Sequence, residues 1–372
     1  MKHLVVILLA LACIGSNAQP VTYLFIGTYT DGKPAKGIYI YRMNMQTGEL
    51  TATGNAENIT NPSFLTLSSG GKYLYACTDT KTAVAGSISA FSIDSVNGGI
   101  NFINKASSEG ANPVYVTADR TNRFVIAGNY TEGNVTVLPA NQNGRLGAAT
   151  QTIQFTDSSI NKERQAKAHI HSVIFSPGDA YLYLPDLGAD KIRAFRFNKA
   201  NKQPLETAGH LMVSTTRGSG PRHMVFHPHK KFAYCIEEMG GSVSVYRYNK
   251  GRLSLLQRIN ANRSKAAEYS SADIHISPDG LFLYASNRIE NTIAIFSINA
   301  SGKLRLLGHE ATAGEVPRNF CIDPGGRFLL VANQNSNNVV VFKRNTKSGL
   351  LTPANIQINV PAPSCLQMRS YH

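Results

Sequence analysis

GSGPRHMVFHPHKKFAYCIEEMGG, the stretch from Gly218 to Gly241, contains the pattern from which the fold of this chain can be predicted. An alternating apolar segment after Pro221 is followed by the turn residues HPHK, and a second apolar segment, FAYCI, ends on two carboxylates. Apolar alternation on both sides of a short turn is typical of a β-hairpin. A hairpin brings its first and last residues to the same edge of a sheet. We therefore expect Arg222 and Glu238 to be neighbours in space, although sixteen positions separate them.

The same pattern recurs along the whole chain. Counted from the proline as position zero, the copies begin at Pro62, Pro113, Ile170, Pro221, Ser271, Pro317 and Pro363. Positions three and five are apolar in every copy, a turn follows, and position eleven is then aromatic, as in Tyr73 and Phe232. A repeat of roughly 40–50 residues that carries about four strands is typical of a β-propeller.

The last copy stops at His372, directly after its first strand. Its second strand is predicted at the other end of the chain, at Tyr23–Gly27, and GIYIYRM and ELTATG would supply the third and fourth strands. Ring closure by strands from both termini removes exposed sheet edges. The sequence therefore predicts an all-β, seven-bladed β-propeller that forms one domain over residues 19–372. We expect a monomer.

The first residues, MKHLVVILLALACIGSNAQP, resemble a secretory signal peptide over residues 1–18. A short basic start precedes an apolar run from Leu4 to Ala12, and small residues follow it before Gln19, where we expect cleavage. The apolar run is shorter than the roughly 20 residues that a membrane-spanning helix needs. A lipoprotein signal that uses Cys13 is the alternative, although Ala10–Ala12 fits that pattern poorly. In both cases we expect a periplasmic or extracellular protein with no membrane span.

The formal net charge of +14 is large for a chain of this length. In an exported protein it could indicate an anionic substrate, nucleic acid or a polyanionic cell envelope as the partner. The basic residues form no block, being spread over turns and outer strands, and no aromatic residues alternate with them as nucleic-acid binding would require. We expect a small anionic substrate, such as a lactone that carries a carboxylate or phosphate, and no nucleic acid.

Other chemistry receives little support. The chain has no dinucleotide-binding or phosphate-loop glycine motif, so we expect no cofactor. His227 and His229 are spaced like metal ligands but lie in a turn predicted on the opposite face. His171, Glu238 and Asp186 could supply ligands on the active face, but we assign no metal. The cysteines after residue 18 all lie in strand patterns, which predicts buried thiols.

Columns of the repeat predict the site. Position one and positions sixteen and seventeen of each copy should ring one face around the central channel, and the opposite rim should hold only turn residues. The charged and polar groups on the predicted face are His171, Arg222, Glu238, Arg288 and Arg318. Convergent polar groups at a concave mouth are the usual sign of a binding site. Position seventeen further supplies Tyr29, Asp79, Tyr130 and Gln334, and position sixteen supplies Asn129 and Asn333.

The connection Asp157–Ala168 interrupts the regular spacing and enters this face just before His169 and His171. Long loops in compact folds are often functional. This loop is expected to bring Arg164 and Gln165 over the channel mouth as a partial lid, and His169 could replace or orient His171.

The segments GTYT, NKERQ…HIHSV, GPRHMVFHP…YCIEEM, SADIHISPDG…YASNR and VPRNFCIDPGGRFLLVANQ resemble the lactonase family of seven-bladed propellers. That family includes the bacterial cycloisomerase-type 6-phosphogluconolactonase and the fungal carboxymuconate lactonising enzyme. The resemblance covers essentially the whole chain after the leader. It implies that the histidine of the H-x-H motif (His169 or His171), Arg222, Glu238 and Arg288 carry the activity. Asp79 stands where the family pattern has a longer glutamate.

Lactone hydrolysis without a covalent intermediate is the predicted reaction. His171 or Glu238 would activate water, while Arg222, Arg288 or Arg318 would stabilise the oxyanion. The alternatives are cycloisomerisation of an unsaturated diacid and a propeller that binds an anionic ligand without catalysis. The residues expected to contact the substrate beyond His171, Glu238, Arg222 and Arg288 are His169, Arg164, Gln165, Arg318, Asn129, Tyr130, Tyr29, Asn333 and Gln334.

Overall fold

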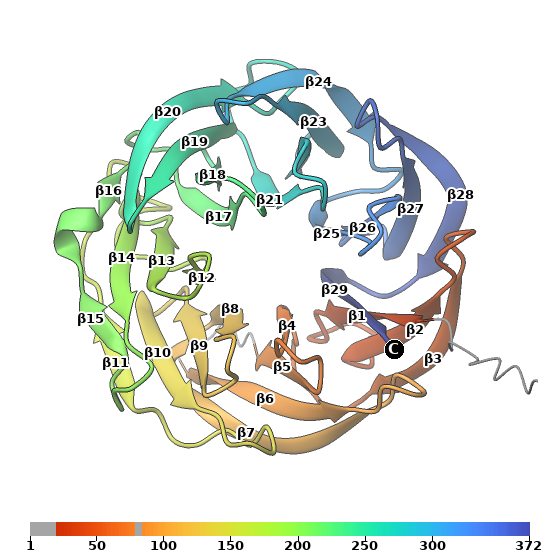
Figure 1. Cartoon of the computed structure of the whole chain (residues 1–372), viewed down its shortest axis with the longest axis horizontal. Helices are drawn as coiled ribbons and strands as arrows, with labels where there is room; N and C mark the ends of the chain where they lie inside the picture. The colour runs from red at the N-terminus through yellow and green to blue at the C-terminus, as the bar shows by residue number, and fades with distance from the viewer. Residues whose placement is uncertain (1–19, 79–83) are drawn as a thin grey trace, which may run out of the picture.

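Seven antiparallel sheets stand around a central channel in the computed structural model, which describes residues 20–78 and 84–372 (Figure 1). Each sheet is one blade, and its strands follow one another outward from the channel. The predicted all-β, seven-bladed propeller is confirmed. The leader predicted over residues 1–18, with Cys13, lies outside the described residues, as does Asp79.

The strands of the blades fall into four concentric layers. The innermost strands are β4 (Leu65–Leu67), β8 (Pro113–Ala118), β12 (Ile174–Phe175), β17 (Pro221–Phe226), β21 (Ser271–Ile276), β25 (Pro317–Ile322) and β29 (Pro363–Tyr371). The second strands are β5 (Tyr73–Thr78), β9 (Phe124–Asn129), β13 (Tyr181–Asp186), β18 (Phe232–Glu237), β22 (Phe282–Asn287), β26 (Phe328–Asn333) and β1 (Val21–Thr28). The third strands are β6 (Ala85–Ile93), β10 (Asn134–Pro139), β14 (Lys191–Phe197), β19 (Ser242–Asn249), β23 (Thr292–Ile298), β27 (Asn338–Arg344) and β2 (Ile38–Met43).

The outermost strands are β7 (Ile100–Ala111), β11 (Gln151–Gln154), β15 (Leu205–Thr207) with β16 (Val213–Ser214), β20 (Arg252–Asn260), β24 (Leu304–Ala311), β28 (Leu351–Asn359) and β3 (Leu50–Ala56). A single turn of 3-10 helix, η1 (Gly209–Leu211), precedes β16. No helix in the described part of the chain is long and apolar enough to cross a membrane.

Strands from the two ends of the chain complete the seventh blade, as the repeat pattern predicts. β29 pairs antiparallel with β1, so that Leu366 lies opposite Ile26 and Tyr371 lies opposite Val21. β2 and β3 then continue the sheet outward. The innermost and second strands of this blade are therefore held together by hydrogen bonds and packing alone, with no covalent turn between them.

The aromatic side chains at position eleven of the repeat pack against a turn of the following blade. Gly302, in the turn between β23 and β24, has a φ of +80°, and a Cβ atom there would lie 2.5 Å from the ring of Phe232 in the preceding blade. The hydroxyl of Tyr234 donates a hydrogen bond of 2.9 Å to the carbonyl of the same glycine. Glycine is needed because an L-residue with this φ would be strained and its side chain would collide with the ring. Gly98, Gly144, Gly251, Gly349 and Gly48 pack on aromatic rings in the same way.

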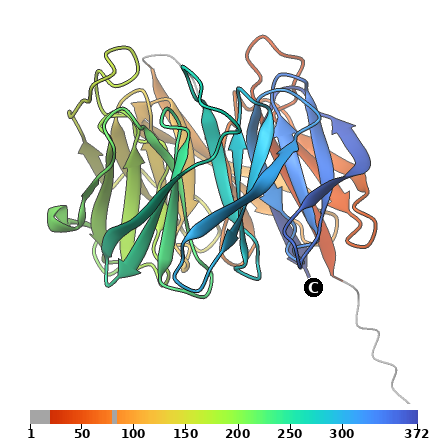
Figure 2. The ribbon, with the colours of Figure 1, turned by 90° about the horizontal axis from the view of Figure 1, so that it is seen from above.

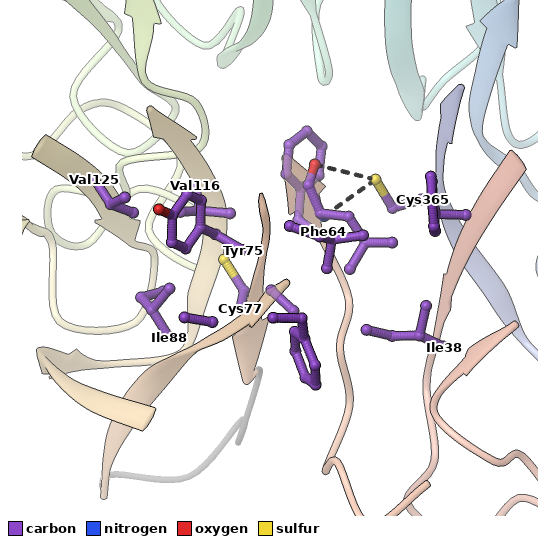
Figure 3. Close-up of a cluster of buried hydrophobic side chains, with 14 of the residues drawn as sticks. Ile38, Phe64, Tyr75, Cys77, Ile88, Val116, Val125 and Cys365 are labelled. Atoms are coloured by element: carbon purple, nitrogen blue, oxygen red, sulfur yellow. Dashed lines mark hydrogen bonds between the residues drawn. The ribbon is translucent and has the colours of Figure 1, made fainter. Parts of the chain in front are cut away.

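The hydrophobic core lies between neighbouring blades. One cluster joins the seventh blade to the blades of β4 and β8 and includes Ile38, Phe64, Cys77 and Cys365 (Figure 3). The predicted buried cysteines are confirmed, because Cys77, Cys235, Cys321 and Cys365 are all free and buried. Burial of this apolar surface on both faces of every sheet is the main stabilising contribution to the ring.

Deleting Pro363–His372 is expected to abolish cooperative thermal unfolding, because it removes β29 and exposes the edge of β1. The matched control is deletion of His372 alone, an exposed residue beyond the last strand pair. Circular dichroism melts of both proteins would check this. A long deletion that melts as sharply as the control would contradict the role assigned to β29.

Candidate active site

The position-one side chains meet at one end of the channel, as the repeat pattern predicts. They surround a cavity of about 10 Å³, enough space for about one water molecule. The lining residues are Ser63, Phe64, Val114, His171, Arg222, His223, Arg318, Asn319 and Ser364. Residues from all but one blade therefore contribute to a single small polar cavity, and Ala272 is the position-one residue that does not line it.

Arg222 is fully enclosed but keeps part of its hydrogen-bonding capacity. Its Nε donates to Glu238 Oε2 at 2.9 Å, and its Nη1 donates to the carbonyl of Ala272 at 2.6 Å and lies 3.3 Å from His223 Nε2. These three contacts use three of the five N–H groups of a guanidinium. The two on Nη2 have no hydrogen-bond partner among the described residues. They are the donors that remain for a ligand.

Glu238 is the carboxylate at the centre of the site. Its Oε2 also forms an ion pair with Arg288 Nη2 at 2.9 Å, and its Oε1 accepts a hydrogen bond from Arg164 Nη2 at 2.7 Å. Burial alone would raise the pKa of Glu238, but Arg288 and Arg222, with smaller contributions from His171 and Arg164, lower that pKa well below its usual value of 4.5. Glu238 is therefore a permanent negative charge shared by three guanidinium groups. The predicted proximity of Arg222 and Glu238 is confirmed.

His171 lies beside this carboxylate and is 6% exposed. Its Nε2 is 3.9 Å from Glu238 Oε2, and its Nδ1 is buried with no hydrogen-bond partner in the described part of the chain. Burial, followed by the charges of Arg222 and His223, lowers the pKa of His171 well below 6.5. His171 is therefore a neutral imidazole at neutral pH, and one ring nitrogen is available to accept a proton.

His169 lies outside the cavity, stacked on Tyr130. The two rings are 4.3 Å apart, and His169 Nδ1 is 2.7 Å from the backbone carbonyl of Tyr130. The ring of Tyr130 also contacts His171 edge-on at 5.4 Å. Of the two histidines that the sequence left open, His171 is the one that the structure brings to Glu238, and His169 holds Tyr130 in place.

The connection Asp157–Ala168 brings Arg164 to Glu238, where Arg164 Nη2 donates to Glu238 Oε1. The loop is fastened below: Asp157 accepts from Lys191 and Arg193, and the hydroxyl of Ser159 donates to Asp190. Gln165 is fully buried and donates to the backbone carbonyl of Leu187. Its expected contact with a substrate is therefore not supported, because its amide is used to hold the loop.

Arg318 lines the same cavity as His171 and Arg222. Its guanidinium carbon lies 5.1 Å from the centre of the Tyr29 ring, and no described carboxylate forms an ion pair with it. Gln334 is half-buried, and its backbone N–H is bonded to Val316. Arg318 is thus the cation of the mouth that is not neutralised by Glu238.

The asparagine side chains at position sixteen of the repeat form hydrogen bonds with the blades. Asn129 and Asn333 are 0% exposed, and their amides donate to the backbone carbonyls of Ser108 and Thr312. The amide nitrogens of these asparagines therefore hold the backbone of the blades, and their contact with a substrate stays a prediction.

Position two holds a set of residues that the sequence analysis missed. His223 Nδ1 lies 2.7 Å from Asp273 Oδ1, and Asp273 also accepts from Asn319 and contacts His275 at 2.9 Å. These side chains form a belt beneath the cavity and close the channel, together with the stacked rings of Phe64 and Tyr115. Reading the second column of the repeat (Phe64, Tyr115, Ser172, His223, Asp273, Asn319 and Cys365) would have shown it.

Burial, together with the adjacent Arg222, lowers the pKa of His223 to about 4. Burial would raise the pKa of Asp273, but His275 and His223 lower it below its usual value. His223 is therefore a neutral ring that donates from Nδ1 to the Asp273 carboxylate and accepts at Nε2 from Arg222. The belt orients the guanidinium on which the cavity depends.

A metal site finds no support here. No group of three or more histidine, cysteine, aspartate or glutamate side chains in residues 20–78 and 84–372 could hold a metal ion. Asp186, one of the ligands considered from the sequence, binds Arg193 and the backbone N–H of His169. His227 and His229 lie near the backbone carbonyls of Gly280 and Pro278 in the neighbouring blade.

Residues 23–368 match the family described as Lactonase, 7-bladed beta-propeller. The chain is 44% identical to a protein of Formosa agariphila named 6-phosphogluconolactonase, over 94% of this chain and 99% of that one. It is 32% identical to a Bacillus subtilis protein of the same name, over 92% of this chain and 97% of that one. The structure of the periplasmic gluconolactonase of Pseudomonas aeruginosa superimposes with a TM-score of 0.89 at 33% identity, covering 94% of this chain and 99% of that one.

Acid is expected to destabilise the fold through His223. The pKa of this ring is 6.5 when unfolded and about 4 when folded, so the unfolded chain takes up a proton below pH 6.5 that the folded chain does not. The free energy of unfolding should therefore fall between pH 6.5 and 4 by about 3 kcal/mol from this group.

His223→Gln keeps a neutral acceptor but cannot titrate, so it should flatten this dependence. Urea unfolding at intervals between pH 7 and 4.5 would measure it, with His229→Gln, an exposed histidine of the opposite face, as the matched control. A His223→Gln slope equal to that of the wild type would show that the ring is not held neutral by the belt.

Proposed function

The chain belongs to the lactonase family of seven-bladed β-propellers, and we propose that it hydrolyses a small anionic sugar lactone of the 6-phosphogluconolactone class. One observation carries the proposal. A neutral His171 with a ring nitrogen available lies beside a fixed carboxylate, Glu238, and lines the same cavity as a guanidinium, Arg222, whose Nη2 donors are unused. Ester hydrolysis needs these parts: a base for water, a charge to stabilise that base when protonated, and donors for the oxyanion.

His171 suits the role of general base better than Glu238. A carboxylate whose pKa is held well below 4.5 by three arginines takes up a proton poorly at neutral pH. The imidazole of His171 is neutral and can accept a proton from water. Glu238, at 3.9 Å, would then stabilise the imidazolium that forms. Of the two candidates that the sequence left open, we therefore assign the base to His171.

Arg222 and Arg318 are positioned to receive the developing negative charge. Both line the same cavity as His171, and Arg222 Nη2 has two N–H groups without a partner in the described chain. Burial, followed by Arg288, lowers the pKa of Arg222 to about 9, so its guanidinium remains charged at neutral pH. A fixed cation in a closed, water-poor site stabilises a tetrahedral oxyanion more strongly than it would in bulk water.

Arg288 and Arg164 would bind the anionic group of the substrate. Both lie on Glu238 at the outer side of the site, and Arg164 is half-exposed at the mouth. A phosphate or carboxylate fits the fork of a guanidinium with two charge-assisted hydrogen bonds. Glu238 offsets one of the four positive charges at the mouth, which leaves an excess that favours an anion.

The reaction then balances without a cofactor. Water gives a proton to His171 while its oxygen bonds to the lactone carbonyl carbon, and the negative charge of the adduct lies against Arg222. The ring C–O bond breaks, the leaving oxygen takes the proton back from His171, and the product is the open-chain hydroxy acid. Cycloisomerisation of an unsaturated diacid would use the same groups in the reverse sense, but the relatives named above favour hydrolysis.

An unphosphorylated aldonolactone is the second candidate, and the similarity to a periplasmic gluconolactonase favours it. We also propose that the chain works as an exported monomer. Export is supported by the leader-like composition of residues 1–18 and by that same periplasmic relative. A sugar phosphate is a cytoplasmic metabolite, so export of the protein would favour the unphosphorylated lactone as its substrate.

Purified protein should accelerate the hydrolysis of 6-phosphogluconolactone or gluconolactone above the spontaneous rate, measured by acid release with the uncatalysed rate subtracted. If Arg164 and Arg288 bind a phosphate, kcat/KM should be higher for the phosphorylated lactone, and Arg164→Gln should reduce the preference. A preference that is unchanged by Arg164→Gln would remove these arginines from substrate binding, and no acceleration of either lactone would contradict the proposed function.

His171→Asn is expected to lower kcat by about 100-fold or more, with little change in melting temperature, because its Nδ1 makes no contact that the fold requires. Glu238→Gln should lower both activity and stability, because three guanidinium groups lose their buried counter-charge. Added gluconate or phosphate should then raise the melting temperature of Glu238→Gln more than that of the wild type. A His171→Asn protein that melts early but retains its specific activity would make His171 structural.

A further inference from the structure

The exposed charges of this protein are distributed very unequally between its two faces. Tight turns join the third strand to the fourth in each blade, and the first to the second in every blade but the seventh, and all of them lie on the face away from the channel mouth described above. We call this surface the turn face. Its turns are residues 44–49, 68–72, 94–99, 119–123, 140–146, 176–180, 198–204, 227–231, 249–252, 277–281, 299–303, 323–327 and 345–350.

Exposed lysines and arginines dominate the turn face. They are Lys72, Arg120, Arg123, Arg145, Lys199, Lys202, Lys230, Lys231, Lys250, Arg252, Lys303, Arg327 and Lys347. Only Glu49 and Asp279 are exposed carboxylates in these turns, and Asp279 is already bonded to Arg344. Asp94 and Asp179 are half-buried, and Asp179 pairs with Arg120 at 3.4 Å. Asp119 and Asp323 are buried, where they accept hydrogen bonds from the backbone of their own turns.

The loops on the site face are nearly balanced. Their exposed basic residues in the described chain are Lys33, Lys36, Lys162, Arg164, Lys167, Arg217, Arg263 and Lys265. Their exposed acidic residues are Asp31, Glu57, Glu109, Glu132, Glu163, Glu268 and Glu315. The excess of exposed cations is therefore on the face away from the candidate active site, so substrate binding at that site does not account for it.

The shape of the turn face favours a planar partner. The turns are short and end at a similar level around the ring, as the edge-on view shows (Figure 2). Among the cations stand exposed apolar side chains, Val96 at 83%, Leu281 at 49% and Leu350 at 46%. Basic residues interspersed with apolar ones on one face are typical of proteins that lie on an anionic bilayer.

Both ends of the described chain lie on this same face. Val21 is paired with Tyr371, so Pro20 and His372 leave the ring together beside the turns (Figure 2). A protein resting on its turn face would direct the channel mouth away from the surface. The substrate would then enter the site without obstruction.

We propose that the turn face docks the protein on a membrane surface rich in anionic phospholipid headgroups, with the active site facing the solvent. The charges act together: each lysine or arginine within a Debye length of an anionic surface adds a favourable increment, and several are needed for stable attachment. The apolar side chains Val96, Leu281 and Leu350 enter the headgroup region between them. The proposal is independent of the reaction, because no residue of the turn face lines the cavity.

Sedimentation with lipid vesicles tests the proposal. The protein should pellet with vesicles that contain phosphatidylglycerol and phosphatidylcholine, remain in solution with phosphatidylcholine alone, and be released when salt is raised from about 0.05 M to about 0.5 M. Binding that is equal for both vesicle types, or that persists in high salt, would overturn the electrostatic docking.

Matched charge reversals locate the surface. Lys230→Glu, Lys231→Glu, Lys250→Glu and Arg252→Glu together, all in neighbouring turns, should weaken vesicle binding by about 100-fold or more. The control reverses the same number of exposed charges on the site face: Lys33→Glu, Lys36→Glu, Arg263→Glu and Lys265→Glu. Both proteins should keep the melting temperature of the wild type. Equal loss of binding in the two would show that net charge alone, and not the turn face, attracts the lipid.

Soluble polyanions distinguish a bilayer from other sources of negative charge. Heparin and glycerol phosphate are the probes, each added to vesicle-bound protein at low salt. Glycerol phosphate should not displace the protein, because a single headgroup engages only one or two of the cations. A protein that binds heparin but does not pellet with phosphatidylglycerol vesicles would overturn the membrane proposal and identify an anionic polysaccharide as the partner.

Discussion

Ring closure is the constraint on which the rest of this structure depends. β1 and β29 come from opposite ends of the chain, and only their pairing makes the last sheet complete. Once the ring is closed, every blade presents the same repeat positions at the same height around the channel. Position one then lines a common cavity, position two forms the belt beneath it, and the turns are carried to the opposite face. Neither the site nor the turn face exists in an isolated blade.

The site itself is organised by one buried carboxylate. Glu238 compensates Arg164, Arg222 and Arg288, which come from a loop, a neighbouring strand and the next blade. Such a cluster of guanidinium groups would repel itself without a counter-charge in this poorly hydrated environment. Burial, Arg222 and His223 keep His171 neutral, and Glu238 places a negative charge 3.9 Å from its Nε2. The residue that stabilises the cluster is therefore also the one that would stabilise His171 when it is protonated in the proposed reaction.

The belt beneath the cavity gives the site its rigidity. Asp273 holds the ring of His223 in place. His223 and the carbonyl of Ala272 in turn engage Nη1 of Arg222, so that the free N–H groups of this guanidinium are those on Nη2. The two faces of the ring consequently have different chemistry: one has balanced surface charge around a small polar cavity, and the other has an excess of exposed lysine and arginine. A closed ring keeps these two surfaces apart because its strands run from one face to the other, so that each loop is confined to one face.

The sequence by itself determined the architecture and brought the main candidate residues of the site to one face, since both depend on a periodic pattern. Alternating apolar positions, glycine turns and an aromatic column define seven repeats, and the pairing of Arg222 with Glu238 follows from the register of one hairpin. What only the tertiary structure decided depends on contacts between blades, which no single repeat encodes. It placed His171, and not His169, beside Glu238, placed Gln165, Asn129 and Asn333 in backbone hydrogen bonds, and brought His223 and Asp273 next to Arg222. Side-chain direction alternates along a strand, so neighbouring columns of equally polar residues differ in burial and in use, and that difference appears only when the blades are packed together.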